Sequence, residues 1–447
     1  MVLVSVIAAQ FNHHVMPMPS PQTPATPRFF GIRVVRAAFV LAAFGWGVGF
    51  YGPPIFMHTV VQRTAWPLAW VSSAVTAHYL FGAFVVTQLP RLHRRMGVGR
   101  TAVLGAVVTA LGVLGWALCR QPWQLFAAAL LSGGGWVAMG AVAVNAVIAP
   151  WFIRTRPSAL AKAYNGASVG GVIFSPLWVA LIAAWGFTAA AFVVGAVMVT
   201  VVATLAHGVF SNSPERLNQR PDGDSPGTAA LSVTSAQARP LPGSQLWLDR
   251  RFLTLAIGMA AGLFAQIGLI AHLFSLLVPA MGAQFAGLTM GFATACAMAG
   301  RLLTARLVSA RTDRRFTAAA GYGLQLLGSV VLMVAGEHDI ALMLVGVALF
   351  GSGIGNATSL PPMIAQVEFV KEEVPRVIAL IVAMAQATYA FAPAVFGAVL
   401  VASNAGPARI GAGATGLLAV AGLVQGLAIG CFLAGRQHGS VRLGGPR

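Results

Sequence analysis

Apolar residues in this chain are gathered into twelve long runs that are nearly free of charge. Each run has about 20 residues or more, which at ~1.5 Å per helical residue is enough to cross the ~30 Å hydrocarbon core of a bilayer. The runs cover residues 34–58, 70–90, 101–119, 124–150, 158–183, 187–209, 252–279, 284–309, 316–336, 340–367, 375–402 and 410–435. The pattern therefore predicts an all-α membrane protein with twelve transmembrane helices.

One long polar stretch inside the chain, residues 211–250, divides these runs into six and six. Its Pro, Ser, Gly, Asp and Gln residues are typical of a flexible linker. We therefore expect two pseudo-symmetric six-helix bundles, at residues 33–210 and 251–436. An amino-terminal tail, residues 1–32, is Pro-rich and predicted to be disordered, and a short cytoplasmic tail, residues 437–447, follows the second bundle.

Basic residues are distributed unevenly between the two sides that this arrangement creates. If the amino terminus is cytoplasmic, 24 of the 28 Lys and Arg residues lie in cytoplasmic segments. Arg63, Arg120 and Arg409 lie in outer loops, and Arg301 lies within a run. Because positive charge is normally concentrated in cytoplasmic loops, we expect both termini in the cytoplasm and a multi-pass protein of the cell membrane or inner membrane.

Composition excludes several classes of protein. Apolar residues make up 57% of the chain and charged residues 9%, against roughly 25% charged in soluble domains. The net charge of +18 is spread loop by loop and not gathered on one face, which argues against nucleic-acid binding. The cysteines, Cys119, Cys296 and Cys431, are too widely spaced to form a disulfide framework or a metal site. We expect neither a metal nor a cofactor.

The sequence also argues against ATP-driven transport and against catalysis. No Lys is preceded by Gly and followed by Ser or Thr, so no phosphate-binding loop is present. All ten acidic residues lie in loops or at the ends of runs, which leaves no carboxylate relay in mid-membrane. We therefore expect a transporter and not an enzyme, with a receptor built on the same fold as a remaining alternative.

The two sets of six runs repeat one another. The motif G-x4-N-A-x3-P begins at Gly140 and again at Gly351, and the motif F-x7-H begins at Phe50 and again at Phe264. Their common order and near-constant offset indicate duplication. Six runs per half with equal orientation predict parallel repeats about an axis along the membrane normal, an arrangement found in transporters.

Two of the cytoplasmic loops resemble the conserved loop motif of the major facilitator superfamily, which contains Gly, Asp and Arg. The residues that match it are Arg95 and Gly97 in the first copy, and Gly300, Asp313 and Arg314 in the second. In the first copy Arg94 occupies the position expected for Asp, which puts the usual charge lock of that half in doubt. The resemblance covers about residues 33–435 and implies two halves that work by alternating access, with the motif taking part in the conformational change.

A more specific resemblance lies in the residues that join the fourth and fifth runs. The stretch Pro150-Trp-Phe-Ile-Arg-Thr-Arg156, followed by the Gly-rich residues 165–171, is similar to the monocarboxylate and oxalate/formate transporter branch. In that branch an arginine on helix 8 pairs with the substrate carboxylate, and Arg301 matches that position. The resemblance implies a symporter, antiporter or facilitator for a small organic anion such as a monocarboxylate.

Arg301 is also unusual by its position alone, because it lies within an apolar run, twelve residues before Asp313. A cation near the membrane midplane costs at least ~2.5–3.5 kcal/mol and normally faces a water-filled cavity or a partner. We expect Arg301 to bind the substrate, and the alternative is a structural role in the loop motif. No lysine stands on helix 1 or 11, where the branch often has a second cation. This favours a substrate with one carboxylate, or a substrate outside the usual range of the branch.

Four uncharged polar residues are expected to complete the binding site. They are Tyr51, Gln266, Gln386 and Tyr389, near the middle of helices 1, 7 and 11, which face the cavity in this family. Hydrogen-bonding groups at that depth suit the orientation of a small polar solute. Each could instead bond a neighbouring helix.

Three histidines, His58, His78 and His272, are candidates for proton coupling because histidine titrates near neutrality. His58 and His272 lie near the outer ends of their runs, where a structural role is favoured, and His78 lies deeper. Exchange or facilitated movement without protons are alternatives.

Together these features predict a secondary active or facilitative transporter that works as a monomer in the lipid bilayer on a small, anionic substrate. The alternative is efflux of amphipathic, drug-like compounds. Arg301 weighs against efflux, because a carrier of such compounds would prefer an acidic or wholly apolar cavity.

Overall fold

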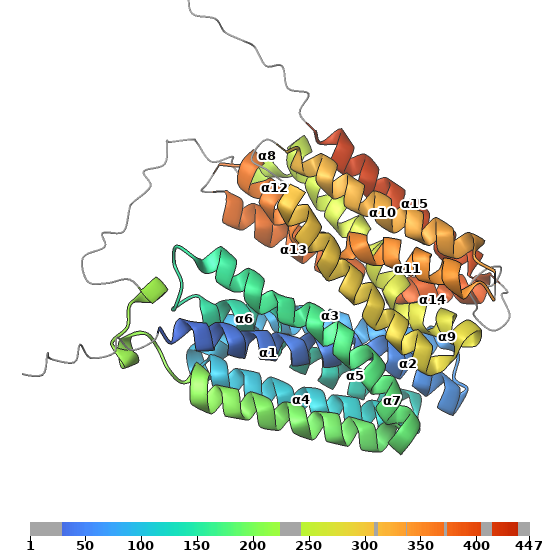
Figure 1. Ribbon diagram of the computed structural model, residues 1–447, viewed down its shortest axis with the longest axis horizontal. Coiled ribbons are helices and arrows are strands. Elements are labelled where there is room, and N and C mark those ends of the chain that lie inside the picture. The colour runs from blue at the N-terminus through green and yellow to red at the C-terminus, as the bar shows by residue number, and fades with distance from the viewer. Residues whose placement is uncertain are drawn as a thin grey trace, which may run out of the picture.

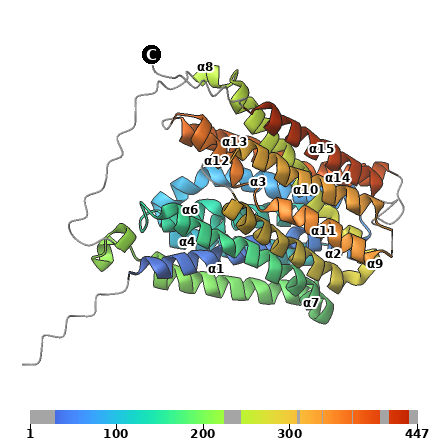
Figure 2. The ribbon, with the colours of Figure 1, turned by 45° about the horizontal axis from the view of Figure 1, so that its top comes forward.

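All regular structure in the computed structural model is helical across the residues it describes, which are 29–223, 243–307, 312–336, 338–370, 373–403 and 414–436. The helices share one long direction and form two layers, α1–α7 below and α9–α15 above (Figure 1). The two layers are also seen in a turned view (Figure 2). Most of the two predicted tails and part of the linker lie outside the described residues.

The first layer contains seven α-helices. They are α1 (Gly31–Gly49), α2 (Gly52–Thr64), α3 (Leu68–Met96), α4 (Val98–Leu118), α5 (Pro122–Trp136), α6 (Ala141–Ile148) and α7 (Arg156–Leu205). A 3-10 turn, Val137–Met139, joins α5 to α6, and a π-helical turn, Ala206–Phe210, follows α7. Helices dominate because a backbone N–H or C=O in lipid has no water to bond and must be paired within its own segment.

The second layer repeats this plan. Its helices are α8 (Gly243–Leu246), α9 (Arg250–Leu307), α10 (Arg314–Val334), α11 (Ile340–Ile354), α12 (Leu360–Glu368), α13 (Val374–Tyr389), α14 (Ala392–Ala402) and α15 (Thr415–Ala434). The short α8 is a single turn that precedes the first long helix.

Nine segments of the described chain are long and apolar enough to cross a membrane, and α11 is apolar but shorter. This supports a multi-pass membrane protein, although the count is below the twelve that hydrophobicity predicts. Two segments, Arg156–Phe210 and Arg250–Leu307, have 55 and 58 residues, far more than one crossing requires. Each contains a glycine with left-handed backbone, Gly186 (φ 76°) and Gly282 (φ 74°). Only glycine adopts this conformation without strain, and both glycines lie at or next to a predicted boundary between runs.

The first span is broken near its middle, between α1 and α2. α1 ends at Gly49 and α2 begins at Gly52, followed by two prolines that cannot donate a hydrogen bond to the preceding turn. Side chains of α3 bond the carbonyl groups that the break leaves free. His78 Nε2 donates to the Gly49 oxygen at 2.9 Å, and the Tyr79 hydroxyl donates to the Phe50 oxygen at 3.4 Å. The break thus places polar backbone deep within the layer.

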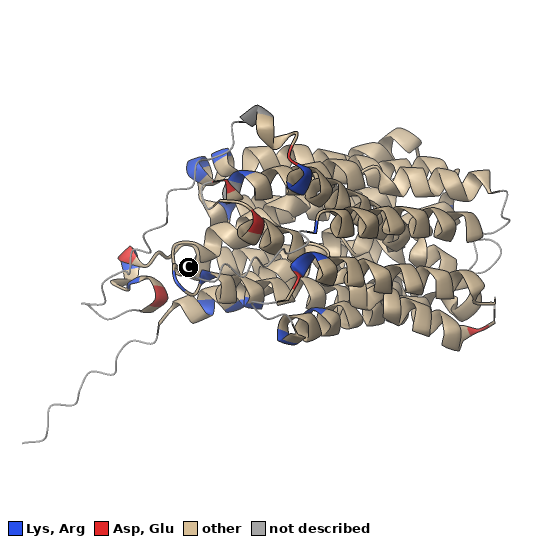
Figure 3. Cartoon of the chain, turned by 90° about the horizontal axis from the view of Figure 1, so that it is seen from above, with Lys and Arg blue, Asp and Glu red and all other residues tan. Residues whose placement is uncertain are grey.

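Charged residues are concentrated at one end of the helices, which we call the basic end (Figure 3). It comprises the end of α3, the loop between α6 and α7, and the starts of α4, α9 and α10. Arg63, in the last turn of α2, and Arg120, just before α5, lie at the opposite end of the helices, which we call the far end.

The two layers are packed together at the far end. His58 Nδ1 of α2 lies 3.1 Å from Ser275 Oγ of α9, and the backbone N–H of Ala394 donates to Thr76 Oγ1 at 3.1 Å. α3 packs extensively against α14 there, whereas its contact with α13, which continues the same span toward the basic end, is much weaker. The layers are therefore closed at the far end and part toward the basic end.

Candidate functional site

Arg301 lies on α9, partly buried, where the two layers face each other. Its Nε donates to the carbonyl oxygen of Gly355 at 2.9 Å. Its remaining N–H groups bond no acceptor among the described residues, and none of the described ion pairs includes it. A guanidinium presents its donors as a planar fork that matches a carboxylate with two parallel hydrogen bonds. Arg301 therefore carries a positive charge that pairs with no carboxylate among the described residues.

The turn between α11 and α12 holds Arg301 in place. A Cβ on Gly355 would lie 2.0 Å from the oxygen of Ala297 and 3.1 Å from Cβ of Arg301, so only glycine permits this approach. The next residue, Asn356, donates from Nδ2 to Thr304 Oγ1 at 2.7 Å. The turn belongs to the second copy of the repeated G-x4-N-A-x3-P motif, which thus joins two helices beside the cation.

Tyr51 stands in the break between α1 and α2 and faces α9. Its ring lies beside the side chain of Thr294, seven residues before Arg301 on the same helix. Gly171 of α7 leaves room for them, because a Cβ there would lie 2.7 Å from both the Tyr51 ring and the Thr294 methyl group. Tyr51 from the break and Thr294 from α9 therefore bring a phenol and a hydroxyl together, with the cation of Arg301 about two turns further along α9.

A small, largely apolar pocket adjoins this point. Its lining residues are Tyr51, Ile270, Leu273, Met290, Ala293, Thr294, Phe350 and Ile354. The hydroxyl groups of Tyr51 and Thr294 are its polar groups. The pocket has room for about one water molecule in this state, so a larger solute would need the surrounding helices to separate.

Tyr389 joins the same region through a residue that the sequence did not single out. It ends α13, and its ring centroid lies 6.1 Å from that of Tyr79 on α3. Tyr79 also packs against Phe50, the residue before Tyr51, with ring centroids 6.1 Å apart. Gln386, one turn before Tyr389, is partly buried. Tyr79 escaped notice because a single tyrosine on an apolar helix gives no sign of the direction in which it points.

Gln266 lies away from this cluster. The Nε2 group of Gln325 on α10 donates to its Oε1 at 3.1 Å. Further along the same interior, Ser329 Oγ lies 3.1 Å from Gln425 Oε1 of α15. These contacts join helices of the second layer, as the inter-helix alternative for Gln266 requires.

The sequence can now be compared with known proteins. A model of the Major Facilitator Superfamily matches residues 37–393. The chain belongs to this superfamily. Among curated relatives, monocarboxylate transporter 11 of Mus musculus is 28% identical over 173 residues, which is 38% of this chain and 37% of that protein. Aspyridones efflux protein apdF of Emericella nidulans is 25% identical over 209 residues, 45% of this chain and 42% of that protein. This chain therefore matches less than half of the length of either relative.

Two solved transporter structures are similar in fold. The nucleoside transporter NupG has a TM-score of 0.68 and 12% identity, with 91% of this chain and 98% of that chain covered. An inward-facing, occupied bacterial homolog of the human lysosomal transporter Spinster has a TM-score of 0.61 and 13% identity, with 91% and 94% covered. At these identities the likeness concerns the fold alone. The protein is a multi-pass transporter of the Major Facilitator Superfamily.

In this transporter His78 is fully hydrogen-bonded within the first layer. Its Nε2 donates to the Gly49 oxygen at 2.9 Å, and its Nδ1 lies 2.9 Å from Ser132 Oγ. Trp116 Nε1 donates to the same Ser132 oxygen at 3.1 Å. Because the Gly49 carbonyl can only accept, Nε2 must carry the proton in this contact. The neutral ring then leaves Nδ1 free to accept from the Ser132 hydroxyl, so both ring nitrogens are satisfied.

The other two histidines lie near the contact between the layers of the transporter. His58 bonds Ser275 and packs edge-on against Phe274, with ring centroids 5.1 Å apart. His272 is buried, and its Nε2 donates to the oxygen of Pro393 at 2.9 Å. The three histidines are thus separate and form no continuous chain with Arg301.

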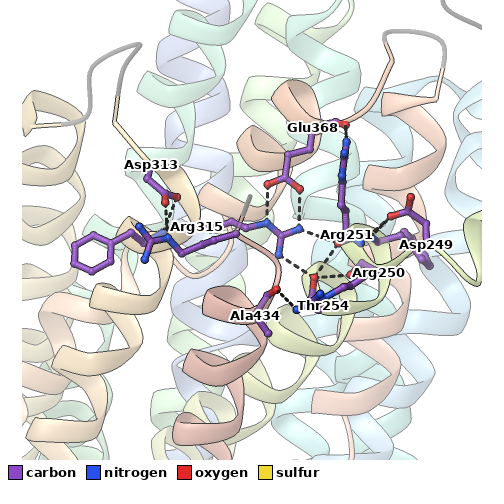
Figure 4. Close-up of polar contacts among 11 residues, drawn as sticks. Asp249, Arg250, Arg251, Thr254, Asp313, Arg315, Glu368 and Ala434 are labelled. Carbon is purple, nitrogen blue, oxygen red and sulfur yellow. Dashed lines mark hydrogen bonds and ion pairs between the residues drawn. The ribbon is translucent and has the colours of Figure 1, made fainter. Parts of the chain in front are cut away.

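The second copy of the superfamily motif holds the basic end of the second layer (Figure 4). Buried Arg315 binds both carboxylate oxygens of Glu368, at 2.6 and 2.7 Å, and donates to Thr254 Oγ1 at 3.0 Å. Asp313 caps α10 and accepts from Arg436 Nε at 2.6 Å. Partial burial would raise the pKa of Asp313, but these contacts lower it below its usual value. The cluster ties α9, α10, α12 and α15 together.

Two further motif residues of this copy flank the cluster. Gly300 lets α9 approach the neighbouring span, because a Cβ there would lie 2.2 Å from the oxygen of Ser352. Arg314 begins α10 and is partly buried. The buried ion pair is made by the next residue along the chain, Arg315, which closes the Asp313-Arg314-Arg315 stretch of the motif.

The first copy of the motif has no such ion pairs. Gly97 (φ 81°) caps the start of α4, and Arg95 is exposed. No Asp or Glu precedes Glu215 anywhere in the sequence, so the first layer has no carboxylate of its own. The two halves of the transporter are therefore held at the basic end in different ways.

Proposed function

We propose that the protein transports a small organic anion with one carboxylate, and that Arg301 binds this carboxylate. The observation that carries the proposal is the guanidinium of Arg301, which is partly buried between the layers with donors that no described residue accepts. A buried charge without a partner is costly. A carboxylate that arrives with the substrate removes that cost while bound, which gives the site its selectivity for anions.

The neighbouring groups have roles that follow from their positions. Tyr51 and Thr294 orient the solute by hydrogen bonds, and Tyr389 and Gln386 approach from α13 of the second layer, where Tyr389 meets Tyr79 of the first. The name of monocarboxylate transporter 11 agrees with such a substrate, but the match covers only part of that protein. Efflux of amphipathic compounds is the second candidate, favoured by the apolar pocket beside Tyr51 and by the partial match to an efflux protein.

We further propose twelve crossings, in two six-helix bundles at residues 33–210 and 251–436. Divided at Gly186 and Gly282, the two longest segments each supply two crossings. The consecutive helices α11 and α12 together form one more crossing. Each of the other seven long apolar segments crosses once, which gives twelve crossings in all. The concentration of Arg and Lys at the basic end supports a cytoplasmic location for that end and for both termini in the cell membrane.

Alternating access follows from the packing of the layers. With the basic end in the cytoplasm, the closed far end and the looser basic end correspond to an inward-open state. Transport then requires the contacts at the far end to break while the ends of α6, α7, α12 and α13 approach each other. We expect the protein to do this as a monomer.

The test is uptake of labelled acetate, lactate and pyruvate into proteoliposomes, with and without a pH gradient. Arg301→Ala should reduce uptake by roughly tenfold or more, since it removes charge-assisted hydrogen bonds. Arg301→Lys, which keeps the charge without the fork, should fall between Ala and wild type. Arg306→Ala, an exposed residue on the same helix, is the matched control and should leave uptake unchanged.

Uptake by Arg301→Ala at the wild-type rate would overturn the assignment of Arg301. Movement of amphipathic compounds but of no carboxylate would instead support efflux. A dependence of wild-type uptake on the pH gradient would establish proton coupling, and its absence would favour exchange or facilitated transport.

A further inference from the structure

The first part of the linker, residues 211–223, packs against the basic end of the first layer. The Asp222 N–H donates to the Trp151 oxygen at 2.9 Å, in the loop between α6 and α7. Gln219 Oε1 accepts from the N–H of Phe30, at the start of α1, at 2.8 Å. Phe30 and Trp151 are themselves in ring contact, with centroids 5.3 Å apart. Three segments that are distant in sequence therefore meet at one place.

The carboxylate of Asp222 is the centre of this contact. Its Oδ2 accepts from the backbone N–H groups of Ile153 and Arg154 at 3.1 and 2.8 Å. Its Oδ1 accepts from the N–H of Thr155 at 3.1 Å and from the Thr155 hydroxyl. These N–H groups belong to the loop before α7 and to its N-cap residue, Thr155, close to the positive end of the helix dipole. Asp222 thus binds the loop that leads into α7 from 67 residues away.

Two further observations show that Asp222 is held firmly. Its backbone is left-handed (φ 60°). This conformation is energetically unfavourable for any residue that has a side chain, and it persists where surrounding contacts fix it. Burial would raise the pKa of its carboxyl, but the Thr155 hydroxyl and the three N–H groups lower it to about 2. The charged form is therefore bound far more strongly than the protonated form.

The acids of the second layer act differently. Asp249, Asp313 and Asp339 each accept a backbone N–H from two or three residues further along their own helix. The first layer has no acid before Glu215, so its helix starts cannot be capped by a local carboxylate. The linker supplies the missing one.

We propose that residues 211–223 form a clasp, in which Asp222 holds the loop between α6 and α7 and Gln219 holds the start of α1. The clasp makes this part of the linker a structural element of the first layer. The connection that is free to follow the relative movement of the two halves therefore begins after residue 223, and not at residue 211 as composition predicts. Asp222 is a positioning residue that acts through loop 149–155 on the basic ends of α6 and α7.

The test is amide hydrogen exchange of the purified full-length protein, followed by mass spectrometry. Asp222→Ala should increase exchange of the amides of residues 153–155 by roughly tenfold or more, because each loses a bond to a charged acceptor. It should also increase exchange of the Phe30 amide, which Asp222 does not touch, because Gln219 leaves with the linker. This coupled release across 190 residues distinguishes a clasp from a local cap.

Three further variants complete the design. Asp222→Gly permits the left-handed backbone without strain and removes the whole side chain, so it should reproduce the release if the carboxylate, and not the backbone conformation, is responsible. Gln219→Ala should release the Phe30 amide and leave residues 153–155 protected. Asp339→Ala removes a cap of α11 at the far end and should change neither region. Release of residues 153–155 in Asp222→Ala without release of Phe30 would overturn the clasp, as would unchanged exchange at both.

Discussion

At the scale of single residues, hydrogen-bond partners decide which polar groups are available for transport. Arg301 keeps donors without acceptors, whereas His78 uses both ring nitrogens, one toward Ser132 and one toward Gly49. A group already satisfied by the protein must break those bonds before it can bind a proton or a solute. We therefore assign His78 to the structure of the break in the first span, and not to proton coupling.

This assignment predicts the behaviour of His78 variants. His78→Phe should destabilise the protein by about 1–3 kcal/mol, because it leaves the Gly49 carbonyl buried without a donor. His78→Gln, whose amide can still donate to Gly49, should lose less. Thermal unfolding in detergent measures both effects. For whichever variant stays folded, the dependence of uptake on pH should match wild type, and a shifted pH profile would return His78 to the proton pathway.

At the scale of helices, breaks in the spans position the site. Tyr51 lies in the break of the first span, Tyr389 precedes the break between α13 and α14, and Gly355 forms the break between α11 and α12. A continuous helix would hide its carbonyl groups, while a break exposes them and permits close approach of a neighbouring helix. The prolines and glycines that form these breaks are visible in the sequence.

Substitution at Gly355 tests this role. Gly355→Ala places a methyl group 2.0 Å from the Ala297 oxygen, and overpacking of this kind typically costs about 1–3 kcal/mol. We expect lower thermal stability and reduced uptake, since Arg301 loses its fixed acceptor. Gly430→Ala on α15 is the matched control, because a Cβ there meets nothing; it should be neutral or slightly stabilising. Equal effects of the two substitutions would remove the special role of Gly355.

The clasp of the linker should be insensitive to pH in the physiological range. The carboxyl of Asp222 has a pKa of about 2 in the folded protein, below its ordinary value of 3.8. A lowered pKa stabilises the contact above pH ~4, and this stabilisation is lost only as the pH falls from there toward 2. Exchange at residues 153–155, corrected for the intrinsic rate, should therefore show equal protection from pH 5 to 8. Loss of protection within that range would contradict the assigned contacts.

The sequence predicts an all-α protein that crosses the membrane several times, and this is confirmed, while the role of Arg301 stays a prediction. The sequence does not show the direction in which most side chains point. Charge and apolar length identify the runs and mark Arg301 as exceptional. In lipid, however, both faces of a helix are apolar, so periodicity does not show which face is inward. Gln266 was therefore placed with the solute although it bonds Gln325, and Tyr79 was missed. The contacts of Asp222 were also invisible, because they join segments 67 residues apart.

At the scale of the whole molecule, the packing between the layers sets the state of the transporter. The far end is closed by contacts of α2 and α7 with α9 and of α3 with α14. These surfaces include the two hydrogen bonds, His58 with Ser275 and Thr76 with the N–H of Ala394. Both must break before the far end can open. They are absent from any other state that separates these helices, so they bias the equilibrium toward the closed far end.

Removing one of these bonds should shift the equilibrium measurably. Ser275→Ala deletes the bond to His58 and little else, and His58→Phe keeps a ring against Phe274 without the bond. A net contribution of about 1 kcal/mol corresponds to a change of roughly fivefold in the ratio of the two states. Spin labels at the exposed positions Gln62 of α2 and Gln284 of α9 report the separation at the far end. Both variants should increase the long-distance population alike, because they remove the same bond. If neither does, the far end is held by apolar packing alone, and the hydrogen bond between His58 and Ser275 forms without influencing which side of the membrane the site faces.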